Sequence, residues 1–173
     1  MAFDFTKTYH QKPYPTISPS RNPQTGRTVL ITGGSSGIGF AIARAFVAAS
    51  AAHVIITGRR EGALNDAVEK LEAGVVDGSG SEVTGEVCDM ADPTESEVVW
   101  QKLKQDGVNI DVLVLNAAWM DMATLSEGLT KTWESFNVNV LANCRMIDAF
   151  MGQGAEAGKV GTVRLSCGRD FAD

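Results

Sequence analysis

The chain has 173 residues, of which 44% are apolar and 21% charged, a composition that excludes a disordered chain. No apolar run approaches the roughly 20 residues of a transmembrane helix, which excludes a membrane partner. Its formal net charge of −6 argues against nucleic acid as a partner, because phosphate backbones are bound by basic surfaces. Three widely spaced cysteines and the lack of a basic, apolar leader predict reduced thiols and a cytoplasmic location, and neither histidine has metal-ligand spacing.

The first elements of the chain form a recognisable unit. Residues 1–26 are polar, hold four of the five prolines and show no periodicity, which predicts an irregular N-terminal arm. A strand is predicted at residues 28–32, where a short run rich in β-branched residues leads directly into a glycine-rich turn. Apolar residues then recur at helical spacing from Ile38 to Ala49, and a second strand follows at residues 53–57. This order of elements is a βαβ unit.

The alternation of helices and strands continues along the chain. Asp92, Pro93 and Glu95 are typical of a helix start, which favours an acidic N-cap followed by proline at the first helical position. An apolar stripe from Trp133 to Met151 predicts one long fourth helix. The predicted elements after the first unit are helices near residues 64–71, 93–103 and 133–151 and strands at residues 82–88, 111–115 and 162–166.

Five strands that alternate with four helices predict an α/β fold, a Rossmann-type doubly wound, mostly parallel sheet with helices on both faces. We expect one nucleotide-binding domain over residues 27–173, without internal repeats. A sheet of this kind binds its ligand in the crevice where the strand order reverses, here between the first and fourth strands.

The turn after the first strand has the glycine pattern of a dinucleotide-binding loop. Gly33 permits the tight turn, Gly37 leaves no side chain between the backbone and a pyrophosphate, and Gly39 lets helix and strand pack closely. The helix N-terminus offers unpaired N–H groups to an anion, and Ser35, Ser36 and Ile38 belong to the same turn. The alternative is a glycine turn capped by its serines without a ligand, which the flanking strands make less favourable. A P-loop is excluded because no Gly-Lys-Ser/Thr follows.

The end of the second strand indicates which dinucleotide is bound. NAD-binding chains usually place Asp or Glu there, whereas this chain has Gly58 followed by Arg59 and Arg60. Guanidinium groups suit the 2′-phosphate of NADP(H), which they bind through charge-assisted, bidentate hydrogen bonds. The alternative is a solvated arginine pair at the start of the second helix. The missing acid also speaks against an S-adenosylmethionine methyltransferase.

These motifs resemble the short-chain dehydrogenase/reductase family over residues 28 to about 166. The stretch from Thr32 to Gly39 matches the cofactor motif of the family, and Thr57-Gly-Arg-Arg60 is similar to its NADP-preferring members. The segment from Tyr14 to Pro19 resembles members from filamentous fungi. The resemblance implies an NADP(H)-dependent oxidoreductase acting on a carbonyl or alcohol of a small-molecule metabolite.

The resemblance also implies roles for residues after the later strands. Asp89 would hydrogen-bond the adenine amino group, although a turn acid is the alternative, and Asn116 would hold the strand and the ribose. Asn139, with Asn137 as the competing match, would hold a water of the proton relay, and Ser166 would orient the substrate carbonyl. The family's Asn-Asn-Ala-Gly is matched in part, because Leu115 replaces the first Asn and Ala118 the Gly, and Ala118 and the bulky Trp119 stand where the cofactor would approach closely.

The catalytic Tyr-x-x-x-Lys of the family does not occur in the sequence, whose two tyrosines are Tyr9 and Tyr14. The resemblance therefore predicts a truncated member that binds NADPH but shows no detectable carbonyl reduction by itself, because general acid catalysis is worth about 10² to 10⁴ in rate. We expect the fifth strand to be an exposed edge and Phe150 and Met151 to lack cover. The alternative function is a non-catalytic dinucleotide-binding or interaction module that docks onto a full-length relative, as a homo- or hetero-oligomer through the fourth helix.

Overall fold

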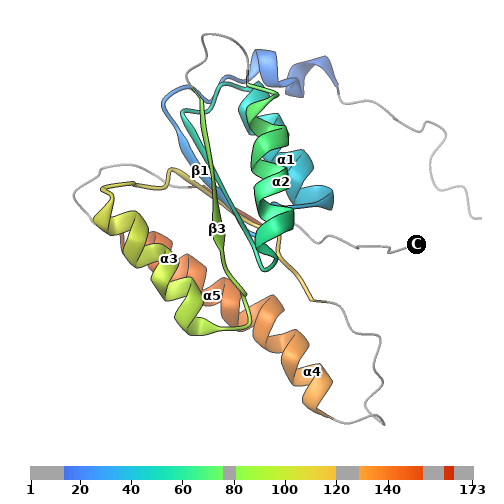
Figure 1. Cartoon of the computed structure of the whole chain (residues 1–173), viewed down its shortest axis with the longest axis vertical. Coiled ribbons are helices and arrows are strands. Elements are labelled where there is room, and N and C mark those ends of the chain that lie inside the picture. Colours follow the sequence, from blue (N-terminus) through green and yellow to red (C-terminus); the bar gives the residue numbers. More distant parts are fainter. Residues whose placement is uncertain (1–13, 76–80, 120–128, 154–161, 166–173) are drawn as a thin grey trace, which may run out of the picture.

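The computed structural model describes residues 14–75, 81–119 and 129–153 and the strand at 162–165. The described residues form a parallel sheet with helices on both faces (Figure 1). Its strands are β1 (Thr28–Ile31), β2 (His53–Gly58), β3 (Glu82–Val87), β4 (Val112–Leu115) and β5 (Thr162–Leu165). Its helices are α1 (Gly37–Ala48), α2 (Glu61–Glu72), α3 (Pro93–Gln105), α4 (Leu129–Phe136), the π-helix η4 (Asn137–Ala142) and α5 (Asn143–Met151).

The sheet has the strand order β3-β2-β1-β4-β5, and every pair in it is parallel. The order reverses between β1 and β4, which confirms the predicted doubly wound fold and puts the ligand crevice at the carboxyl ends of these two strands. Each strand begins and ends within one residue of its predicted bounds. Short runs of β-branched residues flanked by glycine and polar residues were therefore sufficient to locate the strands.

Each face of the sheet has its own hydrophobic core, because neighbouring residues of a strand point to opposite faces. Val29 and Ile31 of β1 pack with Ala43 of α1 and Leu64 of α2 on one face. Leu30, between them in sequence, belongs to the core on the other face, which α3 and α5 cover. The strands β1, β2 and β4 are therefore buried from both sides, as parallel strands normally are, whereas β3 is partly exposed.

The buried side of α1 differs from the predicted apolar stripe. Ala43 and Val47 are buried, whereas Ile38, Ala41 and Ala45 are exposed. The reason is that α1 is apolar almost all round its circumference, so periodicity could not select one face. By contrast, the start of α3 is as predicted, since the Asp92 carboxylate accepts a 2.8 Å hydrogen bond from the backbone N–H of Thr94.

The long helix predicted after the fourth strand is divided by the π-helix. Of the predicted stripe, Trp133, Phe136 and Val140 are exposed, whereas Phe150 is buried and Ile147 packs against the core. Met146, outside the stripe, is buried as well. The π segment has i to i+5 hydrogen bonds, so a 3.6-residue period cannot be extended through it. The expectation that Phe150 lacks cover was wrong, because it packs in the core below α3; Met151, 73% exposed, does lack cover.

The part of the predicted N-terminal arm that the structure describes contains two short 3₁₀ helices, η1 (Pro15–Ile17) and η2 (Pro19–Arg21), each of which begins at a proline. The chain after them is attached to the end of α1 through a 2.7 Å hydrogen bond from the Gln24 N–H to the Ala49 carbonyl. Within the described ranges, no helix is long and apolar enough to cross a membrane.

Candidate cofactor site

The turn between β1 and α1 depends on its glycines. Gly33 and Gly37 have φ of 66° and 55°, values that side chains disfavour. A Cβ on Gly39 would overlap the Gly33 carbonyl oxygen and lie 2.5 Å from the Asn116 side-chain nitrogen, so helix and turn approach as closely as backbone allows. The roles predicted for Gly33 and Gly39 in the turn thus have a direct steric basis.

Asn116 joins the ends of β1 and β4. Its Nδ2 donates to the carbonyl oxygens of Thr32 at 3.0 Å and of Gly33 at 3.1 Å. The Thr32 hydroxyl oxygen in turn accepts from the backbone N–H groups of Asn116 and Ala117, both at 3.0 Å. These contacts fix the glycine turn against the strand across the crevice, which is the strand-holding role predicted for Asn116.

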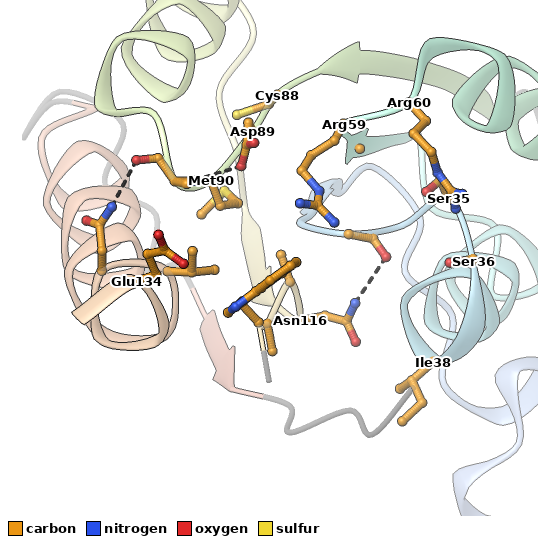
Figure 2. Close-up of a pocket in the computed structure, with 18 residues that line it drawn as sticks. Ser35, Ser36, Ile38, Arg59, Arg60, Cys88, Asp89, Met90, Asn116 and Glu134 are labelled. Carbon is orange, nitrogen blue, oxygen red and sulfur yellow. Dashed lines mark hydrogen bonds between the residues drawn. The ribbon is translucent and has the colours of Figure 1, made fainter. Parts of the chain in front are cut away.

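A cavity of about 340 Å³ lies at this edge of the sheet (Figure 2). Its lining comes from the glycine turn, the ends of β2, β3 and β4, and the α4–η4 segment. Stretches that are far apart in the sequence thus converge on one site at the predicted crevice. The lining residues are Gly33, Ser35, Ser36, Ile38, Gly58, Arg59, Arg60, Cys88, Asp89, Met90, Ala91, Asn116, Ala117, Ala118, Trp119, Glu134, Asn137 and Val138.

The N-terminus of α1 forms one side of the cavity. Ser36 is the N-cap residue, yet its side chain makes no hydrogen bond to the helix. The alternative of a turn capped by its serines is therefore not what the structure has at this position. Because the hydroxyl leaves the first N–H groups of α1 without a side-chain cap, the backbone here suits an anion such as a pyrophosphate.

Arg59 and Arg60 bring two positive charges to the cavity from the end of β2. In Figure 2 the Arg60 side chain extends toward Ser35, and that of Arg59 reaches toward the centre of the cavity. The Arg59 guanidinium carbon lies 5.5 Å from the centroid of the Trp119 ring, a cation–π contact. Neither arginine has an ion-pair partner among the described residues. Both guanidinium groups are therefore available to a phosphate.

Asp89, after β3, also lines the cavity and shapes its own turn. Its Oδ1 accepts a 2.9 Å hydrogen bond from the Ala91 N–H, and its backbone N–H donates to Glu95 Oε2 at 2.6 Å. The turn role weighed as an alternative is thus present, and adenine binding by Asp89 stays a prediction.

Next to Asp89, burial raises the pKa of the Cys88 thiol to about 11, with a smaller contribution from Glu95, so this thiol is protonated and unreactive at neutral pH.

Two asparagines of the π-helix hold the remaining wall. Asn139 makes both of its amide contacts with the main chain of Trp119: Oδ1 accepts from the N–H at 2.8 Å, and Nδ2 donates to the carbonyl at 2.7 Å. Asn137 Nδ2 donates to the Ala91 carbonyl at 3.0 Å. Asn143 Nδ2 donates to the Asn139 carbonyl at 2.8 Å. The helix is thereby attached to the loops that follow β3 and β4.

The predicted site residues differ in how they relate to the cavity. Most cofactor-binding candidates line the cavity, while Gly37 and Gly39 shape the turn behind it. Asn139 is outside the lining and acts on it through Trp119, and Ser166 lies outside the described residues. Sequence reasoning missed Glu134 and Met90, which also face the cavity; no local pattern marked them, because only the fold brings their segments together.

The chain was compared with protein families and known proteins. A family model described as short chain dehydrogenase matches residues 27–164. The chain belongs to this family. The short chain dehydrogenase/reductase AacuD of Aspergillus aculeatus is 32% identical over 149 residues, which cover 84% of this chain and 50% of that protein. The mouse dehydrogenase/reductase SDR family member 4 is 34% identical over 131 residues, which cover 75% of this chain and 45% of that protein.

Solved structures of short-chain dehydrogenases share the fold. The L-sorbose reductase of Gluconobacter frateurii, crystallised with NADPH and L-sorbose, superposes with a TM-score of 0.72 at 26% identity, covering 83% of this chain and 53% of that one. The chain thus spans about half the length of the curated relatives and the solved structure that it matches. The matched half contains the whole cavity described above.

Proposed function

We propose that this short-chain dehydrogenase chain binds NADP(H) and forms the cofactor-binding part of an oxidoreductase that acts on a carbonyl or alcohol of a small-molecule metabolite. The observation that carries the proposal is the pair Arg59 and Arg60, which line the cavity at the end of β2 without an ion-pair partner among the described residues. An NAD-binding chain usually has a carboxylate at this place. The NADPH complex of L-sorbose reductase supports the same cofactor.

The residues present fit such a cofactor at three points. The uncapped first turn of α1 and the glycines before it suit the pyrophosphate, because no side chain separates backbone from ligand. Arg59 and Arg60 suit the 2′-phosphate, and Asp89, which follows the neighbouring strand β3, suits the adenine amino group. When bound, the nicotinamide would supply or accept a hydride. The Asn139 amide would hold the wall of the cavity through the main chain of Trp119.

Titration of the purified chain with NADPH and with NADH by calorimetry tests the proposal, with circular dichroism on the same sample to establish folding. Binding is the readout because the 173 residues hold no Tyr-x-x-x-Lys. We expect tighter binding of NADPH, and loss of that preference in the double variant Arg59→Ala/Arg60→Ala. Hydrogen bonds to charged groups are worth about 1.5–3 kcal/mol, so each guanidinium contributes about tenfold or more.

The matched control is Arg44→Ala, which removes an exposed arginine of α1 that does not line the cavity. It should leave both affinities unchanged. Equal affinity of the folded wild-type chain for NADPH and NADH would contradict the choice of cofactor. A folded chain that binds neither dinucleotide would contradict the cofactor-binding role itself.

Association through α4 is a separate part of the proposal. Leu129 and Trp133 of this helix are 73% and 64% exposed, and the Trp133 ring stacks on Phe136 with 5.4 Å between centroids. Apolar side chains gathered on one helix favour a protein partner.

The relatives named above are reductases or dehydrogenases by name, which favours an oxidoreductase over a purely structural module.

A further inference from the structure

The contact between Arg59 and Trp119 crosses the crevice. Arg59 follows β2 and Trp119 follows β4, while β1 lies between these two strands in the sheet. The 5.5 Å contact of guanidinium and ring therefore joins the two sides of the cavity over the carboxyl end of β1. A residue that reaches across a binding crevice to one of its charged groups affects the position of that group.

Trp119 is fixed at its main chain. Its N–H and its carbonyl are both bonded to the amide of Asn139, so the loop that carries the ring is held on the π-helix. The residue is 37% exposed. The main chain at the base of the ring is thus held in place. Replacing the side chain would leave the two Asn139 hydrogen bonds in place, because on the Trp119 side they involve only main-chain atoms.

Arg59, by contrast, has little else to fix its side chain. No carboxylate of the described residues lies within ion-pair distance of it, and the residue is exposed. A free arginine side chain has about 2 kcal/mol of rotamer entropy to lose when it binds a ligand. A guanidinium that already lies over an aromatic ring has lost part of that freedom before the ligand arrives.

The contact with the ring and the binding of a phosphate use different properties of the guanidinium. The Arg59 guanidinium carbon lies over the Trp119 ring, 5.5 Å from its centroid, where the attraction acts on the positive charge and uses none of the N–H donors. The donors therefore stay available to phosphate oxygens. The two interactions are compatible in the same complex.

We propose that Trp119 is a positioning residue for the 2′-phosphate, holding the Arg59 guanidinium over the cavity and so contributing to the preference for NADP(H) over NAD(H). This inference rests on the proposed cofactor. It assigns a role in specificity to a bulky residue that directly follows the partly matched Asn116-Ala117-Ala118 motif. The adenosine and pyrophosphate, common to both dinucleotides, would be bound without its help.

The test compares Trp119→Ala and Trp119→Phe with the wild-type chain in calorimetric titrations with NADPH and NADH. We expect Trp119→Ala to weaken NADPH binding about two- to fivefold, the factor that a cation–π contact at an exposed site supports, with NADH binding unchanged. Trp119→Phe keeps an aromatic face and should lose less than Trp119→Ala. Val98→Ala, which removes a 57% exposed apolar side chain of α3 outside the cavity, should bind both dinucleotides as the wild type does.

A double-mutant cycle separates positioning from direct contact. In an Arg59→Ala background, Trp119→Ala should have no further effect on NADPH binding, because the group that it positions is gone. An equal loss for NADPH and NADH, or the same loss in both backgrounds, would overturn the inference. If the wild-type chain itself shows no preference for NADPH, the proposed cofactor fails; if the preference survives Trp119→Ala undiminished, only the inference about Trp119 fails.

Discussion

The two walls of the cavity are built by opposite means. The wall formed by the glycine turn and α1 depends on missing side chains, since a Cβ on Gly39 would overlap the Gly33 carbonyl. The wall formed by the loop after β4 and the π-helix depends on side chains that reach main-chain atoms, above all the amides of Asn137 and Asn139. Asn116 connects the two walls.

The two walls show two ways in which the geometry of a binding site can be fixed. Close backbone packing gives the glycine wall a geometry that a single methyl group would disturb. The amide contacts of the other wall are individually modest and partly open to solvent, so that wall is held less strongly. We therefore expect substitutions on the glycine wall to affect the whole fold and substitutions on the other wall to affect mainly the cavity.

The largest effect is expected for Gly39→Ala. The added methyl group would meet the Gly33 carbonyl and the Asn116 amide, and such overpacking costs about 1–3 kcal/mol of the free energy of unfolding. The measurement is urea unfolding followed by circular dichroism. Gly62→Ala is the matched control, because that glycine lies near the start of α2 and an added methyl group there would meet no atom within 4 Å.

In the control, the gain in helix propensity should make the chain equally stable or more stable by up to about 1 kcal/mol. A comparable loss of stability in both variants would mean that the glycine turn has no special steric role. The contrast between the two walls would then have no basis.

A smaller and more local effect is expected for Asn139. Asn139→Ala removes both contacts with the Trp119 main chain and should lower the free energy of unfolding by about 1–2 kcal/mol. It should also weaken NADPH binding, because the loop that carries Trp119 is no longer held. Asn139→Asp keeps the acceptor for the Trp119 N–H but loses the donor to its carbonyl, so its cofactor affinity should be intermediate. Unchanged stability and unchanged affinity in Asn139→Ala would contradict the role of this wall.

The smallest effect concerns the buried thiol of Cys88, on the same side of the cavity as Asp89. Its pKa is about 11 in the folded chain and near the ordinary 9.0 in the unfolded chain. Between these values the folded state binds more protons, so the contribution of this thiol to stability is present below about pH 9 and is lost as the pH rises toward about 11. Unfolding measured at several pH values should show a steeper alkaline decline of the free energy of unfolding in the wild type than in Cys88→Ala. Parallel declines in the two proteins would refute this contribution of the thiol.

In the folded chain at about pH 8, iodoacetamide should label the exposed Cys144 and leave Cys88 unlabelled.

The glycine wall could be predicted from the sequence, because its rules are local. A strand, three glycines and a helix follow one another within a few residues, and the positions of Gly33, Ser36 and Arg59 at the cavity follow from the fold that they indicate. The strands were predicted for the same reason. Local pattern and final environment agree wherever both faces of a strand are buried.

The other wall could not be predicted in detail. The buried face of the helical segment after residue 129 depends on a π-helix that no composition marks. The apolar stripe was therefore correct for Ile147 and Phe150 after the π-helix and wrong for Trp133, Phe136 and Val140. Trp119 was noted only as a bulky residue after the Asn116-Ala117-Ala118 motif, because its contact with Arg59 joins residues that are 60 positions apart in sequence. Contacts of this kind arise from the order of strands in the sheet and have no local signal.

The π-helix also has a consequence for how the length of this segment can vary. A π turn accommodates one more residue than an α-helical turn, so deletion of a single residue within Asn137–Ala142 would restore an ordinary helix and leave α4 and α5 in nearly the same register. Met146 and Phe150 would therefore stay in the core, and the change would be confined to the segment whose amides hold Ala91 and Trp119. The extra residue of this segment thus serves the wall of the cavity and not the packing of the helix, and a relative with one residue fewer would need a different way to hold these two loops.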